Sequence, residues 1–119
     1  MAKVLGIGGV FYKAQDPEGL RDWYARVLGF ELNGWGGASL PGAPGGQQWS
    51  VFAADSDYLA PSVQPFMLNL VVDDLDGIVA RATGAGVEIL GRQDESYGRF
   101  AWVLDPAGVK VELWQPVED

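Results

Sequence analysis

The stretch YGRFAWVLDPAGVKVELWQP, residues 97–116, has the pattern of two β-strands joined by a tight turn. In its DPAG segment, Pro106 suits the second position of a type I turn and Gly108 suits the left-handed position that follows. A three-residue loop of this kind closes a β-hairpin with a glycine bulge. The register that follows from this turn joins four pairs of residues: Leu104 with Lys110, Val103 with Val111, Trp102 with Glu112, and Phe100 with Trp114.

The two faces of this predicted hairpin differ in chemistry, because paired residues share a face and successive pairs alternate between faces. One face carries small or branched side chains that suit packing beneath helices, namely Ala101, Val103, Val111 and Leu113. The other face carries three rings and one acid, namely Phe100, Trp102, Trp114 and Glu112. Arg99 falls on the first face, where we expect it to form a salt bridge beside a helix or at a sheet edge.

The rest of the chain contains a repeated pattern of strand, helix and further strands. Residues 16–29 predict a helix, with Asp16 as N-cap, Pro17 at the first helical position and Gly29 as the stop. Residues 73–86 repeat this pattern 57 positions later, with DDLD as the cap. Further strands are predicted at residues 4–12, 30–35, 47–55, 65–72 and 87–91, and a mobile loop or ragged hairpin at the glycine-rich residues 34–46. The pattern predicts one domain spanning residues 1–119, with module one at about 1–60 and module two at about 64–119.

The composition limits the functions that this domain can have. Eight basic and sixteen acidic residues give a net charge of −8, which argues against nucleic-acid binding. No apolar run has the length of a membrane span, and the absence of cysteine favours a cytoplasmic location. The absence of both histidine and cysteine argues against zinc, copper and non-haem iron sites and against Ser-His-Asp or Cys-His catalysis. Acid–base chemistry would fall to a carboxylate, a lysine or a tyrosine.

Three segments together carry a resemblance to a known family: DPEGLRDWYARVLGF (16–30), VDDLD (72–76) and the ending at residues 97–116. Over nearly its whole length the chain resembles the glyoxalase/bleomycin-resistance/extradiol-dioxygenase superfamily, also called the vicinal oxygen chelate superfamily. The resemblance implies an α+β fold in which two βαβββ modules form a cupped eight-stranded mixed sheet, with helices on the outer face. It also implies a homodimer and a cavity inside the cup.

The resemblance also bears on metal binding. Metal-using members carry a glutamate on the last strand, and Glu112 matches it, but Gly9 and Met67 stand where histidine ligands are usual. Ser50 or Phe52 would be the remaining ligand. We therefore expect neither a metal nor a cofactor. The candidate ligand-binding residues on the predicted cavity wall are Phe11, Met67, Asn69, Phe100, Trp102, Glu112 and Trp114.

Three functional hypotheses follow for Glu112 and the cup. In the leading one, a metal-free protein binds a small aromatic or cationic organic ligand, as drug-sequestering relatives do, and Glu112 fixes its orientation. In the second, the protein is a glyoxalase-like lyase or isomerase in which Glu112 is catalytic, either as acid–base group or beside an oxygen-ligated metal. In the third, the fold is a structural or regulatory dimerisation module. Glu112 could also be a solvated acid or ion-paired with Lys110, Lys13 or Arg99, and Trp35 and Tyr58 lie in loops that could close over the cavity.

Overall fold

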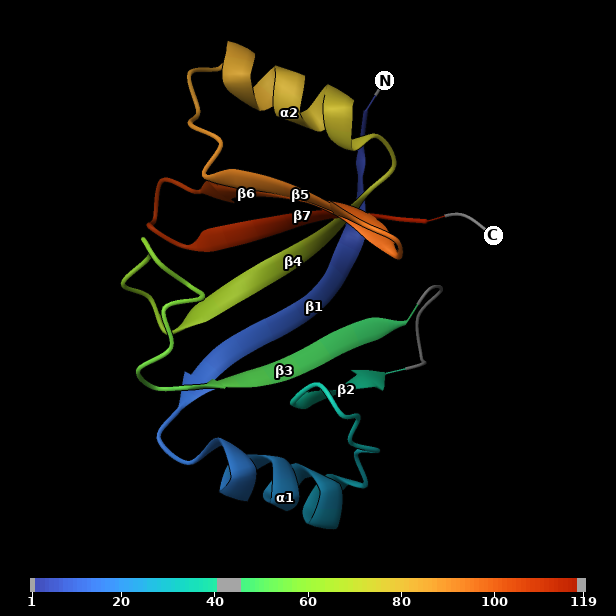
Figure 1. Ribbon diagram of the computed structural model, residues 1–119, viewed down its shortest axis with the longest axis vertical. Helices are drawn as coiled ribbons and strands as arrows, with labels where there is room; N and C mark the ends of the chain where they lie inside the picture. Colours follow the sequence, from blue (N-terminus) through green and yellow to red (C-terminus); the bar gives the residue numbers. More distant parts are fainter. Residues whose placement is uncertain (1, 41–45, 118–119) are drawn as a thin grey trace.

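A computed structural model describes residues 2–40 and 46–117. These residues form one seven-stranded mixed sheet with two helices, in the strand order β2-β3-β1-β4-β7-β6-β5 (Figure 1). The elements are β1 (Val4–Ala14), α1 (Pro17–Leu28), β2 (Gly37–Leu40), β3 (Gln47–Ala53), β4 (Phe66–Val72), α2 (Leu75–Gly84), β5 (Gly91–Glu95), β6 (Gly98–Leu104) and β7 (Lys110–Pro116). Within this described part of the chain, no helix is long and apolar enough to cross a membrane.

The predicted repeat is visible in the strand pairing. β1 pairs in parallel with β3, and β4 pairs in parallel with β7. Parallel partners need a crossover connection, and each module supplies one through its helix. The modules meet at the centre of the sheet, where β1 and β4 pair antiparallel. The α+β fold of two modules is therefore confirmed.

The expectation of eight strands is wrong for the described residues, because the segment 30–35 is not a strand. Its only ladder contact is an isolated bridge between Leu32 and Ala38. The Asn33 side chain accepts hydrogen bonds from the backbone N–H groups of Trp35 and Gly37, at 2.8 and 3.3 Å. This local turn takes up donors that a strand would have used in a ladder. The short strand β2 follows and forms a hairpin with β3. Of the two predictions for the glycine-rich residues 34–46, a mobile loop or a ragged hairpin, the hairpin is therefore the correct one. Residues 41–45 of this segment lie outside the described part.

The strand predicted at residues 87–91 is also displaced toward the C-terminus. β5 begins at Gly91, and its register against β6 ends with Glu95 opposite Gly98. A two-residue turn therefore aligns the polar segment GRQDE with β6, and residues 87–90 remain outside the strand. The sequence of β5 lacks apolar alternation, which is why pattern reading missed it.

Both helices begin at aspartate caps, as predicted. Asp16 accepts a hydrogen bond from the N–H of Gly19, and Gly29 ends α1 in the left-handed conformation with φ 74°. The cap of α2 is Asp74, whose side chain accepts from the N–H of Gly77 at 3.1 Å. The preceding Asp73 accepts from the N–H of Lys3, which joins the start of the chain to the end of β4.

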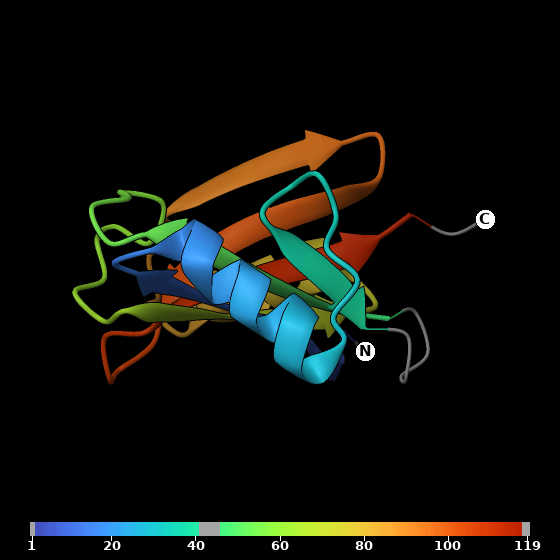
Figure 2. The same cartoon turned by 90° about the horizontal axis from the view of Figure 1, so that it is seen from below.

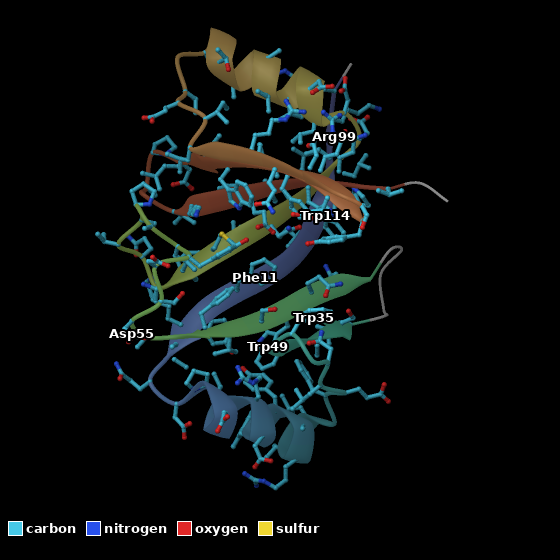
Figure 3. The ribbon with its side chains drawn as sticks, viewed as in Figure 1. Phe11, Trp35, Trp49, Asp55, Arg99 and Trp114 are labelled. Carbon is cyan, nitrogen blue, oxygen red and sulfur yellow. The ribbon has the colours of Figure 1, made fainter. Side chains whose placement is uncertain are left out.

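The pairing register assigns one face of the sheet to the helices. Val10 of β1 lies opposite Trp49 of β3 and Leu68 of β4, and Leu68 lies opposite Val111 of β7. On this face Trp49 packs between the sheet and α1, with its ring 4.6 Å from that of Tyr24 (Figure 3).

At the other end of the same face, α2 covers a cluster that includes Leu75, Ala101 and Leu113, so the predicted helix-side face of the hairpin is confirmed. The salt bridge expected for Arg99 is also present, because Arg99 pairs with Asp76 of α2 at 3.0 Å. Figure 2 shows the β5–β6 end of the sheet rising above the central strands, so the sheet is curved and its other face is concave.

The caps make a testable contribution to stability. Asp74→Ala leaves the N–H of Gly77, in the first turn of α2, without its side-chain acceptor, so we expect the free energy of unfolding to fall by about 1 kcal/mol in urea titration. Asp74→Asn keeps a side-chain acceptor and should lose much less. Equal losses in the two variants would contradict the capping role.

Candidate functional site

A tight turn sets the register that brings the acid and the rings to the concave face. The Asp105 side chain accepts hydrogen bonds from the N–H groups of Ala107 and Val109, both at 2.9 Å, and Gly108 adopts φ 82°. The predicted pairing is confirmed, with Trp102 opposite Glu112 and the other three pairs as expected. The hairpin thus presents one carboxylate among aromatic side chains.

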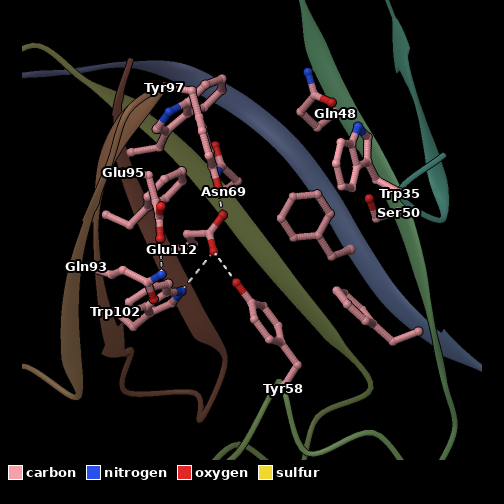
Figure 4. A pocket seen from close by; sticks show the side chains of 14 residues that line it. Trp35, Gln48, Ser50, Tyr58, Asn69, Gln93, Glu95, Tyr97, Trp102 and Glu112 are labelled. Atoms are coloured by element: carbon pink, nitrogen blue, oxygen red, sulfur yellow. Dashed lines mark hydrogen bonds between the residues drawn. The ribbon is translucent and has the colours of Figure 1, made fainter. Parts of the chain in front are cut away.

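The concave face encloses a cavity of about 600 Å³ (Figure 4). This volume lies in the range of pockets that hold small organic molecules. Six of the seven residues predicted for the wall line it: Phe11, Asn69, Phe100, Trp102, Glu112 and Trp114.

The seventh predicted wall residue, Met67, does not line the cavity. It is fully buried in a cluster with Phe11 of β1 and with Leu59, which lies in the segment between β3 and β4. Met67 lies on the concave side, as its pairing with Phe11 requires, but the Leu59 side chain covers it. The strand pattern predicted the face of the sheet on which Met67 lies. It could not predict that the segment between β3 and β4 would cover this residue.

Four further wall residues were named from the sequence in other roles. Ser50 and Phe52 of β3 were named as a possible metal-ligand position, and Trp35 and Tyr58 were expected in loops that could close over the cavity.

Four wall residues were missed by sequence reasoning. Gln48 lies on β3, where it alternates with Ser50 and Phe52 along one face beside β1, so the pairing of these strands would have identified it. Gln93, Glu95 and Tyr97 come from the edge strand and its turn, which carry no periodic signal.

Glu112 is buried, with 4% of its surface exposed, and its carboxylate accepts three hydrogen bonds. Asn69 Nδ2 donates to Oε1 at 2.7 Å, and Tyr58 Oη and Trp102 Nε1 each donate to Oε2 at 2.9 Å. All three donors are neutral. These hydrogen bonds replace the water that the buried carboxylate has lost, and without them its burial would be costly.

The ion pairs considered for Glu112 are not formed. Among the residues that the structure describes, no lysine or arginine lies within salt-bridge distance of it. Lys110 Nζ instead donates to the backbone carbonyl of Tyr58 at 2.6 Å and lies 5.1 Å from the centre of its ring. Partial burial lowers the pKa of Lys110, and the charge of Glu112 opposes this shift.

Tyr58 is held in place from several directions. Its ring stacks on Phe52 with the centroids 5.1 Å apart and an angle of 17° between the planes. Burial raises the pKa of the Tyr58 phenol above its usual range, and the negative charge of Glu112 raises it further. The phenol therefore remains a hydrogen-bond donor to Glu112 over the whole neutral pH range.

Three rings form a nearly parallel series along the wall. The Phe100 centroid lies 6.2 Å from that of Trp102 and 6.2 Å from that of Trp114, with interplanar angles of 12° and 1°.

Two glycines leave room for wall side chains, because they have no Cβ atom that would collide with them. A Cβ at Gly98 would lie 2.5 Å from Trp114 Nε1, and one at Gly8 would lie 2.2 Å from Asn69 Oδ1. Larger residues at either glycine would displace the wall.

Two buried polar atoms in the wall lack a hydrogen-bond partner among the described residues, namely Asn69 Oδ1 and Trp114 Nε1. The other polar atom of the Asn69 side chain, Nδ2, does have a partner, because it donates to Glu112.

The wall does not fit a metal centre of the kind that the superfamily uses. The carboxylate of Glu112 is occupied by an amide, a phenol and an indole, none of which is a good metal ligand. Across residues 2–40 and 46–117, no group of three or more acidic, histidine or cysteine side chains is arranged to hold an ion. Gly9 has no side chain to offer, and Met67 is covered.

Comparison with known proteins places this geometry in context. Residues 9–114 match the model of a family described as Glyoxalase-like domain. Methylmalonyl-CoA epimerase from Mycobacterium tuberculosis is similar over 97% of this chain and 90% of its own, with a TM-score of 0.68 and 23% identity. Methylmalonyl-CoA epimerase from Streptomyces coelicolor, in complex with 2-nitronate-propionyl-CoA, is similar over 98% of this chain and 100% of its own, with a TM-score of 0.68 and 18% identity.

A third structure, described as NAD-dependent benzaldehyde dehydrogenase from Legionella pneumophila, is similar over 92% of this chain and 98% of its own, with a TM-score of 0.62 and 14% identity. A search of curated proteins finds none that matches. At these identities the structural likeness shows the fold alone.

The raised pKa of Tyr58 predicts a dependence of stability on alkaline pH. In the unfolded chain the phenol ionises near its ordinary pKa of 10.0, whereas in the folded protein it keeps its proton to higher pH. Its contribution to stability is therefore complete below pH 10 and is lost as the pH rises above that value. We expect the free energy of unfolding, measured in urea at pH 9 and pH 11, to fall less in Tyr58→Phe than in the wild type. The same fall in both proteins would contradict the assignment.

Proposed function

This chain belongs to the glyoxalase-like domain family, and from that premise we propose that it is a metal-free protein that binds a small aromatic molecule bearing a positive charge. The observation that carries the proposal is a buried carboxylate, Glu112, whose hydrogen-bond donors are all neutral and which lies in a wall of stacked rings. Lys110 acts on this carboxylate through its charge but forms no salt bridge with it, so a ligand cation would supply the direct partner that the described residues do not provide.

The rings supply the rest of the binding energy. A cation close to the face of a tryptophan ring gains about 0.5–2 kcal/mol, depending on how far it is removed from water. Trp114 lies on the same strand face as Glu112 and offers such a ring face, and Phe100 offers apolar contact, whereas the ring of Trp102 already lies 5.8 Å from Lys110 Nζ. The Oε1 atom of Glu112 accepts only one hydrogen bond and so retains capacity for a ligand N–H group.

The charge of the wall opposes anionic ligands. Glu95 is a second acid on the wall, and none of the described residues that line the cavity is basic. Two of the three structural relatives are named as methylmalonyl-CoA epimerases, and coenzyme A carries several phosphate groups. Phosphate recognition in proteins relies on arginine, lysine or backbone N–H groups, so we do not extend that substrate to this chain.

Acid–base catalysis by Glu112 is the second candidate function. The 2.9 Å hydrogen bond between Glu112 and Tyr58 favours this function, because a proton transferred to a bound substrate could then involve both side chains. The three donors weaken this alternative, because they already take up three of the positions at which the carboxylate could accept a proton or a hydrogen bond from a substrate.

The proposal predicts an order of affinities for three probes of similar size that differ in charge: phenethylamine, 2-phenylethanol and phenylacetate. By isothermal titration at neutral pH, we expect the ammonium to bind about tenfold more tightly than the alcohol, which corresponds to about 1.4 kcal/mol. The carboxylate and methylmalonyl-CoA should bind most weakly. Glu112→Gln should abolish the preference for the ammonium and keep the affinity for the alcohol.

A matched control separates the local effect of Glu112 from net charge. Asp55→Asn removes one negative charge from an exposed site outside the cavity and should keep the preference for the ammonium. Equal affinities for all three probes, or a preference for the anion, would overturn the proposal. No binding of any probe would favour a structural module, and turnover of an added substrate that Glu112→Gln abolishes would favour the enzyme.

The metal-free part of the proposal has its own test. We expect the protein dialysed against equimolar manganese, magnesium or zinc to retain less than about 0.1 metal ions per chain, because no group of three or more acidic, histidine or cysteine side chains is arranged to hold an ion in the described part of the chain. Retention of one ion per chain that is lost in Glu112→Gln, and kept in Asp55→Asn, would contradict it.

A further inference from the structure

Two aromatic side chains at the mouth of the cavity are exposed to an unusual degree. Trp35 is 89% exposed and Tyr97 is 64% exposed, although both line the cavity. Trp35 precedes β2 and Tyr97 precedes β6, beside the edge strand β5, and β2 and β5 are the two outermost strands of the sheet. Curvature of the sheet brings these ends to opposite sides of one mouth, as Figure 4 shows.

The backbone that presents Trp35 is fixed. Asn33 accepts hydrogen bonds from the N–H groups of Trp35 and Gly37, and its own N–H donates to the carbonyl of Gly37 at 2.8 Å. The carbonyl of Gly36 accepts from the N–H of Val51, which ties the turn to β3, and Gly36 adopts the left-handed φ of 92° that this turn requires. The exposed indole is thus held on an ordered turn.

Tyr97 is presented in a similar way. The two-residue turn that carries it is closed by the pairing of Glu95 with Gly98, and its ring meets the edge of Phe100 at 5.8 Å. Phe100 in turn stacks on the two tryptophans of the inner wall. Tyr97 therefore extends the aromatic surface from the interior of the cavity to its mouth.

Neither ring serves the fold, since no described hydrophobic cluster of the core includes Trp35 or Tyr97. Large apolar side chains held in water on ordered turns, beside an apolar cavity, are typical of surfaces that a ligand covers. We infer that Trp35 and Tyr97 form an outer subsite, which contacts a second ring of a two-ring aromatic ligand whose cationic end lies near Glu112. This inference rests on the proposed function and specifies the size and shape of its ligand.

The test compares two probes that differ by one ring, phenethylamine and 2-(biphenyl-4-yl)ethylamine. By isothermal titration we expect the second ring to raise the affinity of the wild type about tenfold, as aromatic contacts at both sides of the mouth would give. Trp35→Ala and Tyr97→Ala should each reduce this ratio to about threefold or less. Both side chains are exposed and outside the core clusters, so the variants should fold, which thermal denaturation will check.

The matched control is Trp23→Ala, because Trp23 is a half-exposed tryptophan on α1, on the helix side of the sheet. It should leave the ratio of the two affinities unchanged. If both probes bind and the ratio is one in the wild type, or is the same in all variants, the outer subsite is overturned and the proposed function stands. If neither probe binds the wild type, both are overturned.

Discussion

The three hydrogen bonds to Glu112 join parts of the chain that are far apart in sequence. The acid lies on β7, and its donors come from β4, from β6 and from the segment between β3 and β4. A carboxylate that is 4% exposed needs such donors, because an unsolvated charge is among the most costly features of a protein interior. This requirement accounts for the position of Tyr58 beside Glu112. Tyr58 in turn stacks on Phe52, and its neighbour Leu59 packs against Met67. The shape of the cavity floor thus depends on the satisfaction of one charge.

The features that the sequence predicted are those with a local physical cause. The DPAG turn allows one hairpin register, so the residues facing Glu112 could be counted, and aspartate, proline and glycine marked the helix ends. The failures occurred where tertiary pairing or a side-chain hydrogen bond took over. Asn33 ended a predicted strand, a two-residue turn placed β5 on a polar segment, and the packing of Leu59 withdrew Met67 from the wall. Tyr58 was expected in a loop that could close over the cavity, but its hydrogen bond to Glu112 spans 54 residues, which no local pattern can reveal.

The contrast with the structural relatives lies in the wall rather than in the sheet. The same curved sheet is found in proteins named as methylmalonyl-CoA epimerases, at 23% identity or less. A fold of this kind fixes where the cavity is, whereas its chemistry is set by the few side chains that alternate onto the concave face. In this chain those positions carry rings, amides and acids. The fold match and the proposed ligand class are therefore independent conclusions, one drawn from the backbone and the other from the side chains.

The antiparallel seam between β1 and β4 has a consequence for how the two walls of the cavity can change. Each wall belongs to a separate module: the first supplies Phe11, Ser50 and Phe52, and the second supplies Asn69, Trp102 and Glu112. A substitution at a position that makes no contact with the other module alters one wall and leaves the scaffold of the other intact. Tyr58 is different, because it belongs to the first module and donates to Glu112 of the second, so these two positions are coupled.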